Sequence, residues 1–236
     1  MKKDPSKPQT CIQVEHMPSV SDPAIRLVQV PVLRANSDSF AAFGRLVRDY
    51  QAEQVWIETW PAAGWRPVEA GTGNEGGIAE GQFEFSRSGS LMIARNHAVN
   101  GHYITGWFSD PASAGSDDTS ADYTRVLVRE ANYHPDSGQV FYPLNAEPFM
   151  ALLALPGDDV KPEDFVAFYC DGSFGIQILP NIWHQPIFPL AANASFIGKQ
   201  GKVHACIACD FVREFSCYLS VPLAALPDES SHSGPT

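Results

Sequence analysis

Short runs rich in Val, Ile, Phe and Tyr follow one another through most of this chain, separated by Pro, Gly, Asn and Asp. Such runs are typical of β-strands, because branched and aromatic side chains pack well on a pleated surface. Many short strands with few helices favour an all-β fold, either a closed barrel or a double-sheet jelly roll. The predicted strands span residues 27–33, 83–85, 90–94, 123–128, 139–142, 149–155, 166–169, 175–179, 203–210 and 215–221.

One segment near the N-terminus has helical rather than alternating spacing. Phe40, Phe43 and Val47 fall on one face of a helix, and Ser37 or Asp38 precedes them. A Ser or Asp side chain at that place accepts the free N–H groups of the first helical turn. The pattern therefore predicts a short N-terminal helix ahead of the strands.

The chain reads as one domain. Residues 1–23 and 227–236 are rich in Pro, Ser and charged residues and have no clear period, so we interpret them as mobile tails. The 203 residues between them, 24–226, show no repeat and no convincing linker, and a β domain of that size is common. Residues 97–122 stand out as an insertion, and their second half is rich in Ser, Asp and Gly.

Charge and hydropathy exclude several classes of partner. The net charge is −11, and the 16 Lys and Arg residues are scattered, whereas a nucleic-acid groove needs clustered positive charge. No apolar run approaches the roughly 20 residues of a membrane helix, and no apolar stretch follows the first residues. We expect a cytoplasmic protein that binds neither nucleic acid nor membrane, with its five cysteines reduced.

Two segments carry residues suited to chemistry. The first runs from Asn132 through His134 to Gln139, and the second contains Trp183 and His184. In a strand, residues two apart point to the same face, so residues 132 and 134 would aim into one interior. The spacing is that of the cupin metal motif, in which His-x-His, an acid and a later His hold a divalent metal.

This chain keeps that spacing but changes its chemistry. Asn132 stands in place of the first His, and Gln139 stands in place of the acid. Two imidazoles and two neutral amides suit a divalent cation poorly, because no negative charge offsets the desolvation of the metal. We expect no cofactor, or a weakly bound divalent metal with His134, Gln139 and His184 as ligands. The ordinary alternatives are a turn residue for His134 and a half-buried core residue for His184.

The stretch His134-Pro-Asp-Ser-Gly-Gln139-Val-Phe-Tyr-Pro-Leu resembles the signature of the ureidoglycolate lyases, which are cupins. Residues 181–188 resemble the Trp-His-His-Pro segment of that family, and residues 39–44 resemble its opening helix. The resemblance implies a cupin-type barrel, a homodimer, and a lyase that splits ureidoglycolate into glyoxylate and urea in allantoin and purine breakdown. It also implies functional roles for His134, Gln139, Trp183, His184 and Arg95.

The chain departs from the family at several positions. Leu179 stands where the family usually has a His, and Gln185 replaces its second consecutive His. These changes replace proton-transfer groups with neutral side chains, so they bear on the substrate more than on the fold.

Elimination from ureidoglycolate, a carbinolamide, needs a base for its hydroxyl and an acid for the leaving nitrogen. Our hypothesis makes His184 the base and His134 the acid or the orienting group. Three sets of side chains would bind substrate: Asn132 and Gln139 for the ureido amide, Trp183 and Gln177 as further contacts, and Arg95 or Arg213 for the carboxylate.

Two other functions stay open at this point. One is a cupin isomerase or epimerase acting on a small hydroxy or sugar acid. The other is a barrel that binds a small molecule without catalysis, since the acidic ligand is missing. The Cys206-x-x-Cys209 spacing is better explained by buried, apolar thiols than by a zinc or redox site, because no second cysteine pair accompanies it.

Overall fold

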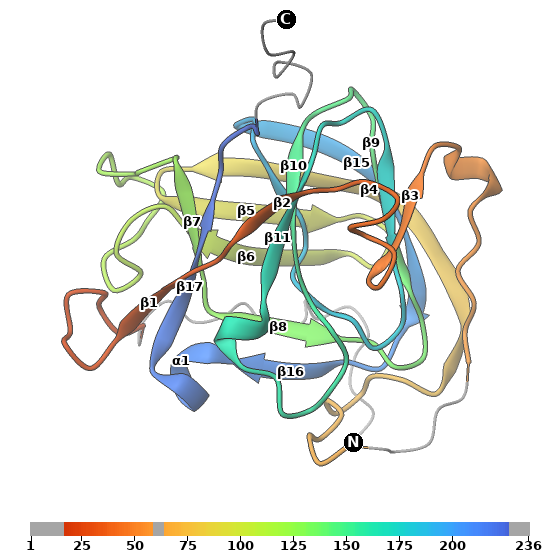
Figure 1. The fold of residues 1–236 in the computed structure, drawn as a ribbon, viewed down its shortest axis with the longest axis horizontal. Helices are drawn as coiled ribbons and strands as arrows, with labels where there is room; N and C mark the ends of the chain where they lie inside the picture. Colours follow the sequence, from red (N-terminus) through yellow and green to blue (C-terminus); the bar gives the residue numbers. More distant parts are fainter. Residues whose placement is uncertain (1–16, 59–63, 227–236) are drawn as a thin grey trace, which may run out of the picture.

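Almost every regular element of this protein is a strand, as a computed structural model of residues 17–58 and 64–226 shows (Figure 1). The described residues contain one α-helix, α1 (Phe211–Phe215), and two 3₁₀ turns, η2 (Tyr50–Ala52) and η3 (Pro162–Asp164). No helix in these ranges is long and apolar enough to cross a lipid bilayer. The strands are β1 (Arg26–Gln29), β2 (Val32–Arg34), β3 (Gly44–Val47), β4 (Glu75–Ser88), β5 (Leu91–Asn96), β6 (Gly101–Trp107), β7 (Arg125–Val128), β8 (Glu130–Tyr133), β9 (Gln139–Pro143), β10 (Phe149–Ala154), β11 (Val166–Cys170), β12 (Gly175–Ile178), β13 (Trp183–His184), β14 (Phe188–Pro189), β15 (Asn193–Val203), β16 (Ile207–Asp210) and β17 (Cys217–Pro222).

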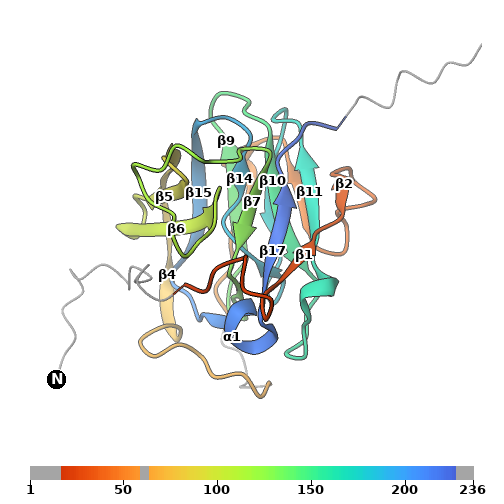
Figure 2. The same ribbon diagram turned by 90° about the vertical axis from the view of Figure 1, so that its left-hand side faces the viewer.

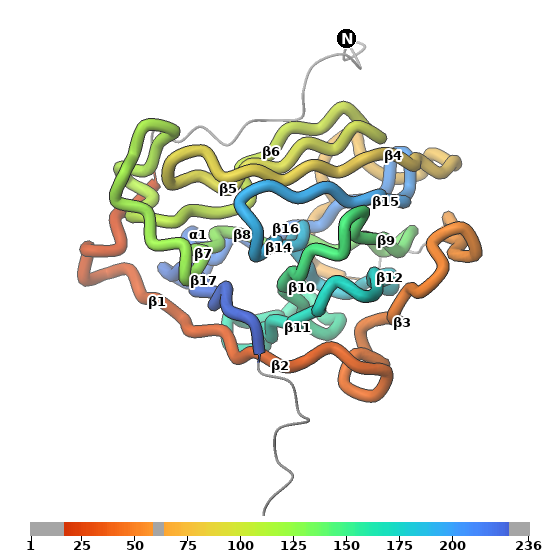
Figure 3. Tube along the Cα trace, turned by 90° about the horizontal axis from the view of Figure 1, so that it is seen from above, coloured from red at the N-terminus to blue at the C-terminus, as the bar shows by residue number. Residues whose placement is uncertain are grey.

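The strands form two sheets. The larger sheet has the order β1-β17-β7-β6-β5-β4-β15-β9-β12-β3, and the smaller has β16-β8-β13-β10-β11-β2, with β14 beside β10. Seen from above, β6, β5, β4 and β15 form one side of the molecule, β2 lies on the opposite side, and β10 and β11 lie between them (Figure 3). The side view shows the same layers (Figure 2). This all-β, cupin-like arrangement confirms the predicted fold class.

Strand β10 is the centre of the structure, because all six of its residues are buried. Phe149, Ala151 and Leu153 face a core that includes Phe83, Phe141 and Phe196 of the larger sheet. The alternate residues Met150, Leu152 and Ala154 face a second core with side chains from β7 and β17. The larger sheet therefore covers both faces of β10, and this explains why its sequence is continuously apolar rather than alternating.

The strand predictions are confirmed for most of the chain, including the three runs 139–142, 149–155 and 166–169. The run 27–33 is divided into β1 and β2, and the run 203–210 is divided by residues 204–206. The predicted strand at 215–221 begins only at Cys217, because α1 precedes it. Sequence reasoning missed β6, β8, β13, β14 and the long β15.

The predicted N-terminal helix does not form. Residues 37–43 make turns in which the Phe40 N–H donates to Asn36 O and the Gly44 N–H donates to Phe40 O, and the chain then enters β3. Strand β3 pairs with β12, and a Cβ at Gly44 would lie 1.9 Å from the carbonyl oxygen of Gln177. The helical spacing of the phenylalanines is thus satisfied by two turns, while sheet pairing takes the residues that follow.

The segment before β1 packs against the predicted insertion. Met17 is buried, the Val20 N–H donates to the Asp110 carboxylate, and Pro18 O accepts the Tyr218 hydroxyl. Residues 17–20 therefore lie against the domain, although we expected them in a tail. Residues 1–16 and 227–236 of the predicted tails lie outside the described residues. Within the insertion, β6 extends the larger sheet beside β5.

Replacement of Leu152 by Ala is expected to lower the free energy of unfolding by roughly 2–5 kcal/mol, because it opens a cavity in a fully buried strand. Leu155→Ala, one residue beyond β10 and 51% exposed, provides the matched control and should change stability by less than about 0.5 kcal/mol. Urea unfolding of both variants measures the difference. Equal losses in the two variants would contradict the central position of β10.

Candidate active site

Three of the connections that carry the chain between the two sheets bring a histidine to the same place, either within the connection or directly after it. His134 lies between β8 of the smaller sheet and β9 of the larger one. His184 follows the crossing from β12 to β13, and His204 lies between β15 and β16. The three crossings meet, because the Asn181 N–H donates to His134 O and the 204–206 loop is bound to the turn after β8.

The backbone of Ala205 joins two of these crossings. Its N–H donates to both carboxylate oxygens of Asp136, at 2.9 and 3.0 Å, and its carbonyl oxygen accepts Nδ1–H of His134 at 2.7 Å. Gly138 completes the turn where a Cβ would lie 2.6 Å from the Ile178 carbonyl oxygen. The segment from His134 to Gln139 therefore forms a turn whose side chains hydrogen-bond to the 204–206 loop.

Strand β13 places His184 in the interior. His184 is in register with Asn132 of β8 on one side and with Leu153 of β10 on the other. Nδ1–H of His184 donates to Ile182 O at 2.8 Å, which fixes the ring and leaves Nε2 directed toward the side chain of Gln139. Asn132 is half-buried beside it, as the i, i+2 argument for residues 132 and 134 predicts.

The three imidazoles are in contact. The rings of His134 and His204 stack with centroids 3.4 Å apart and planes 15° apart, and the ring of His184 lies 5.0 Å from that of His134, edge to face. Ser137 Oγ lies 3.4 Å from Nδ1 of His204. His134 and His184 are only 5% and 3% exposed, so water does not solvate a charge there.

Burial keeps these rings neutral. It lowers the pKa of His184 to about 4, although the hydrogen bond to Ile182 O opposes the shift. Burial lowers the pKa of His204 to about 4, and the repulsion that a protonated His184 would exert acts in the same direction. Burial and the neighbouring histidines lower the pKa of His134 well below its ordinary value. Near pH 7 the cluster therefore presents nitrogen lone pairs, which suits proton acceptance.

A row of amides continues from His184 across the interior. Nε2 of His184 lies 3.2 Å from Oε1 of Gln139, whose Nε2 donates to Oε1 of Gln200 at 3.1 Å. Oε1 of Gln200 also accepts Nδ2–H of Asn96 at 2.9 Å. All three amide side chains are buried. The site is thus a polar strip between otherwise apolar cores.

This donor set does not fit a divalent metal. The described residues contain no group of three or more His, Cys, Asp or Glu side chains arranged to hold a metal ion. The stacking of His134 on His204 directs their ring faces, not their nitrogens, toward each other. The side chains that meet the ring nitrogens of His204 and His184 are those of Ser137 and Gln139, which carry no charge to offset that of a metal ion.

Trp183 does not join the cluster. Adjacent residues of a strand face opposite sides, so Trp183 points into the second core while His184 points toward the amides. Its indole N–H donates to Gly157 O at 2.8 Å, and its ring packs edge to face on Tyr133. Its position supports a packing role rather than the substrate contact predicted from the resemblance.

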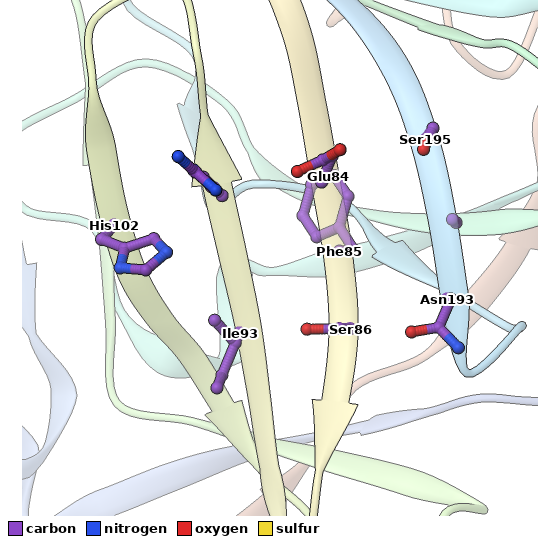
Figure 4. Close-up of a pocket in the computed structure, with 9 residues that line it drawn as sticks. Glu84, Phe85, Ser86, Ile93, His102, Asn193 and Ser195 are labelled. Carbon is purple, nitrogen blue, oxygen red and sulfur yellow. The ribbon is translucent and has the colours of Figure 1, made fainter.

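Three other predicted substrate-binding residues also lie elsewhere. Gln177 donates to Gln54 O on the opposite face of β12 from Ile176 and Ile178, and Arg213 is exposed on α1. Arg95 is exposed on the outer face of the β4–β5–β6–β15 layer, where it lines a hollow with Glu84, Ser86, His102, Asn193 and Ser195 (Figure 4). Neither arginine is among the contacts of the imidazole cluster.

Sequence reasoning missed His204, Gln200 and Asn96. Strand β15 alternates, with Ala194 and Phe196 facing the core, and the same period places Gln200 inward. That alternation could have identified Gln200. Nothing in the local sequence distinguishes His204, because its position depends on the hydrogen bonds of Ala205 with Asp136 and His134.

The two spaced cysteines are not reactive groups. Cys209 is fully buried in the second core, and Cys206 is half-buried beside Glu69 and Glu130. Burial raises the pKa of both thiols, so they stay protonated near pH 7 and are poor nucleophiles.

Two sheets with sheet-crossing connections that gather three buried imidazoles define a cupin-like protein with a polar interior site. The chain belongs to the ureidoglycolate lyase family, whose pattern it matches over residues 27–213. It is 33% identical over 72 residues to a ureidoglycolate lyase of Azotobacter vinelandii, a match that covers 30% of this chain and 43% of that protein. Similar matches join it to ureidoglycolate lyases of Salmonella enteritidis (38% over 74 residues; 30% and 45%) and Brucella anthropi (36% over 71 residues; 29% and 41%). The chain thus spans less than half the length of the curated relatives it matches.

The neutral histidines predict a loss of stability in mild acid. The pKa of His184 is about 4 in the folded state and about 6.5 in the unfolded chain, so the unfolded chain binds the proton first as pH falls. The contribution of His184 to the free energy of unfolding is therefore complete above pH 6.5. It is lost as the pH falls toward 4, and the loss for this one group is roughly 3 kcal/mol. Urea unfolding at pH 7 and pH 4.5 measures the decline.

His184→Gln should reduce this pH dependence, whereas His102→Gln, at an exposed position, should leave it unchanged. The same pH dependence in wild type and His184→Gln would show that His184 is not held neutral by the fold.

Proposed function

We propose that this protein cleaves ureidoglycolate into glyoxylate and urea, as a carbon–nitrogen lyase of the amidine-lyase type. The observation that carries the proposal is the group of three neutral imidazoles, His134, His184 and His204, whose member His184 contacts Gln139. The similarity of the chain to ureidoglycolate lyases supports the same substrate.

The proposed reaction moves one proton and breaks one bond. His184 accepts the hydroxyl proton of the carbinolamide through Nε2, the hydroxyl oxygen forms the carbonyl of glyoxylate, and the carbon–nitrogen bond breaks. The proton then passes from Nε2 of the His184 imidazolium to the leaving ureido nitrogen, so the overall reaction consumes none. A neutral imidazole with its Nδ1–H bound to a backbone carbonyl is well suited to the first step.

His134 is the second imidazole of the proposed site, where it orients the substrate and carries no proton on Nε2 to donate. Its Nδ1–H is held by Ala205 O, so Nε2 is the nitrogen that keeps its lone pair. His204 stacks on it and is the less buried of the pair, which gives the cluster a path for proton exchange with solvent. Asn132, which is half-buried and in register with His184, binds the ureido group in this proposal, whereas Gln139 faces the hydroxyl together with Nε2 of His184.

We propose further that the reaction needs no metal, since the donor set around the imidazoles is neutral and does not fit a divalent cation. The homodimer and the cytoplasmic location expected from the sequence stay predictions. The isomerase and the non-catalytic binding protein are the alternatives that the following assay separates from a lyase.

Glyoxylate release from racemic ureidoglycolate, followed by a coupled assay, is expected to continue in the presence of a chelator. His184→Ala should lower the rate by roughly 10²–10⁴, the usual contribution of a general base. His102→Ala, which removes an exposed imidazole from the outer face, is the matched control and should keep the wild-type rate. Circular dichroism checks that each variant is folded.

Loss of release on chelation would contradict the metal-free mechanism. Release that is unchanged in folded His184→Ala would contradict the site. The absence of release from folded wild type would contradict the lyase assignment and favour an isomerase or a binding protein.

A further inference from the structure

The hydrogen bonds around Gln139 fix which end of its amide faces His184. Asn96 is the starting point, because its Oδ1 accepts the backbone N–H of Ala98 at 3.0 Å and its Nδ2 must then point toward Gln200. Oε1 of Gln200 is consequently the acceptor between Asn96 and Gln139. A backbone N–H can only donate, so this end of the network sets the direction of every amide in it.

Gln139 can therefore adopt only one favourable orientation. Its Nε2 donates to Gln200, and its Oε1 is left against Nε2 of His184 at 3.2 Å. The reversed amide would place two carbonyl oxygens 3.1 Å apart, and that contact would be repulsive in a buried setting.

The other end of the network fixes His184 in the same way. Ile182 O can only accept, so the hydrogen of the neutral ring lies on Nδ1, at 2.8 Å from that oxygen. Nε2 then carries a lone pair and faces the lone pairs of Gln139 Oε1. The nearby ionisable side chains, His134 and His204, are also held neutral by burial and supply no proton to this contact.

We propose that Asn96 and Gln200 are positioning residues that hold Gln139 Oε1 against Nε2 of His184, so that these two acceptors together receive one hydrogen-bond donor of the substrate. Two facing acceptors in a buried site are unfavourable until a donor arrives, so the pair selects a ligand that carries an O–H or N–H at this point. The identification of that donor as the hydroxyl of ureidoglycolate rests on the proposed function. After proton transfer, Gln139 Oε1 accepts the new Nε2–H of the imidazolium.

The orientation is tested in the free protein by ¹⁵N NMR of the imidazole rings at neutral pH, with His184→Gln to assign the signals. We expect His184 to be neutral, protonated at Nδ1 and unprotonated at Nε2. In Gln200→Leu the amide of Gln139 can turn and donate to Nε2, and this moves the Nε2 signal upfield. Gln200→Glu keeps an acceptor oxygen and should restore the wild-type signal, and Asn96→Ala should act in the same direction as Gln200→Leu.

Gln177→Leu is the matched control, because it removes a buried glutamine amide that bonds to the backbone on the other face of β12. Its His184 signals should equal those of wild type. An unchanged Nε2 signal in folded Gln200→Leu, or an Nε2 that is already protonated in wild type, would overturn the inference.

Turnover provides the second measurement. Gln200→Leu should lower kcat by about tenfold or more, because the turned amide of Gln139 then donates to Nε2 of His184 and occupies its lone pair, and Gln200→Glu should recover most of the rate. A moved Nε2 signal with unchanged kcat would overturn the catalytic role of the amide row. A wild type without lyase activity would refute the proposed function alone, because the NMR measurement still decides the orientation.

Discussion

The site depends on one peptide unit, that of Ala205. Its N–H is bound by Asp136 and its carbonyl oxygen by His134, so two connections that cross between the sheets are held together at their midpoints. Burial raises the pKa of Asp136, even though the Ala205 N–H opposes that shift. These hydrogen bonds of Ala205, which we call the Ala205 clamp, bring His204 onto His134 although the two residues are 70 positions apart. They hold the 204–206 loop at the site.

The remaining features follow from how the sheets surround this clamp. Strand β13 is only two residues long, yet pairing with β8 and β10 is enough to direct His184 toward the amides and Trp183 into the second core. The apolar cores on both faces of β10 exclude water, and that exclusion lowers the pKa values of the histidines. Burial therefore keeps the imidazoles unprotonated, so that they act as bases rather than acids. The orientation of the Gln139, Gln200 and Asn96 amides determines where a hydrogen-bond donor of the substrate can be accepted.

The sequence predicts the parts of this account that depend on local patterns. Alternation and turn residues identify most strands, and the two-residue periodicity places Asn132 and His134 on one face. The same periodicity applied to adjacent residues would have excluded Trp183 from the site, because a strand cannot direct it and His184 to the same side. The helix predicted at residues 37–47 fails because pairing of β3 with β12 overrides a local spacing that two turns also satisfy.

Other parts depend on contacts that local patterns do not contain. Arg95 is predicted from the family resemblance and Arg213 from its charge, and only the fold shows that the first lies on the outer face and the second on an exposed part of α1. His204, Gln200 and Asn96 come from three separate elements, and they meet only through long-range pairing of β4 with β5 and β15 and through the Ala205 clamp.

The most direct test of the central claim is an NMR titration with the 4-amide of malate, which is ureidoglycolate with its leaving nitrogen replaced by a methylene group, so that it keeps the hydroxyl and cannot be cleaved. The chain has seven histidines, and their ring signals report separate places on the molecule. The account predicts that the signals of His134, His184 and His204 move together on binding, while those of His97 and His102 stay unchanged. Movement confined to His102, beside the outer hollow, would contradict the account and place the ligand on the other face of the sheet.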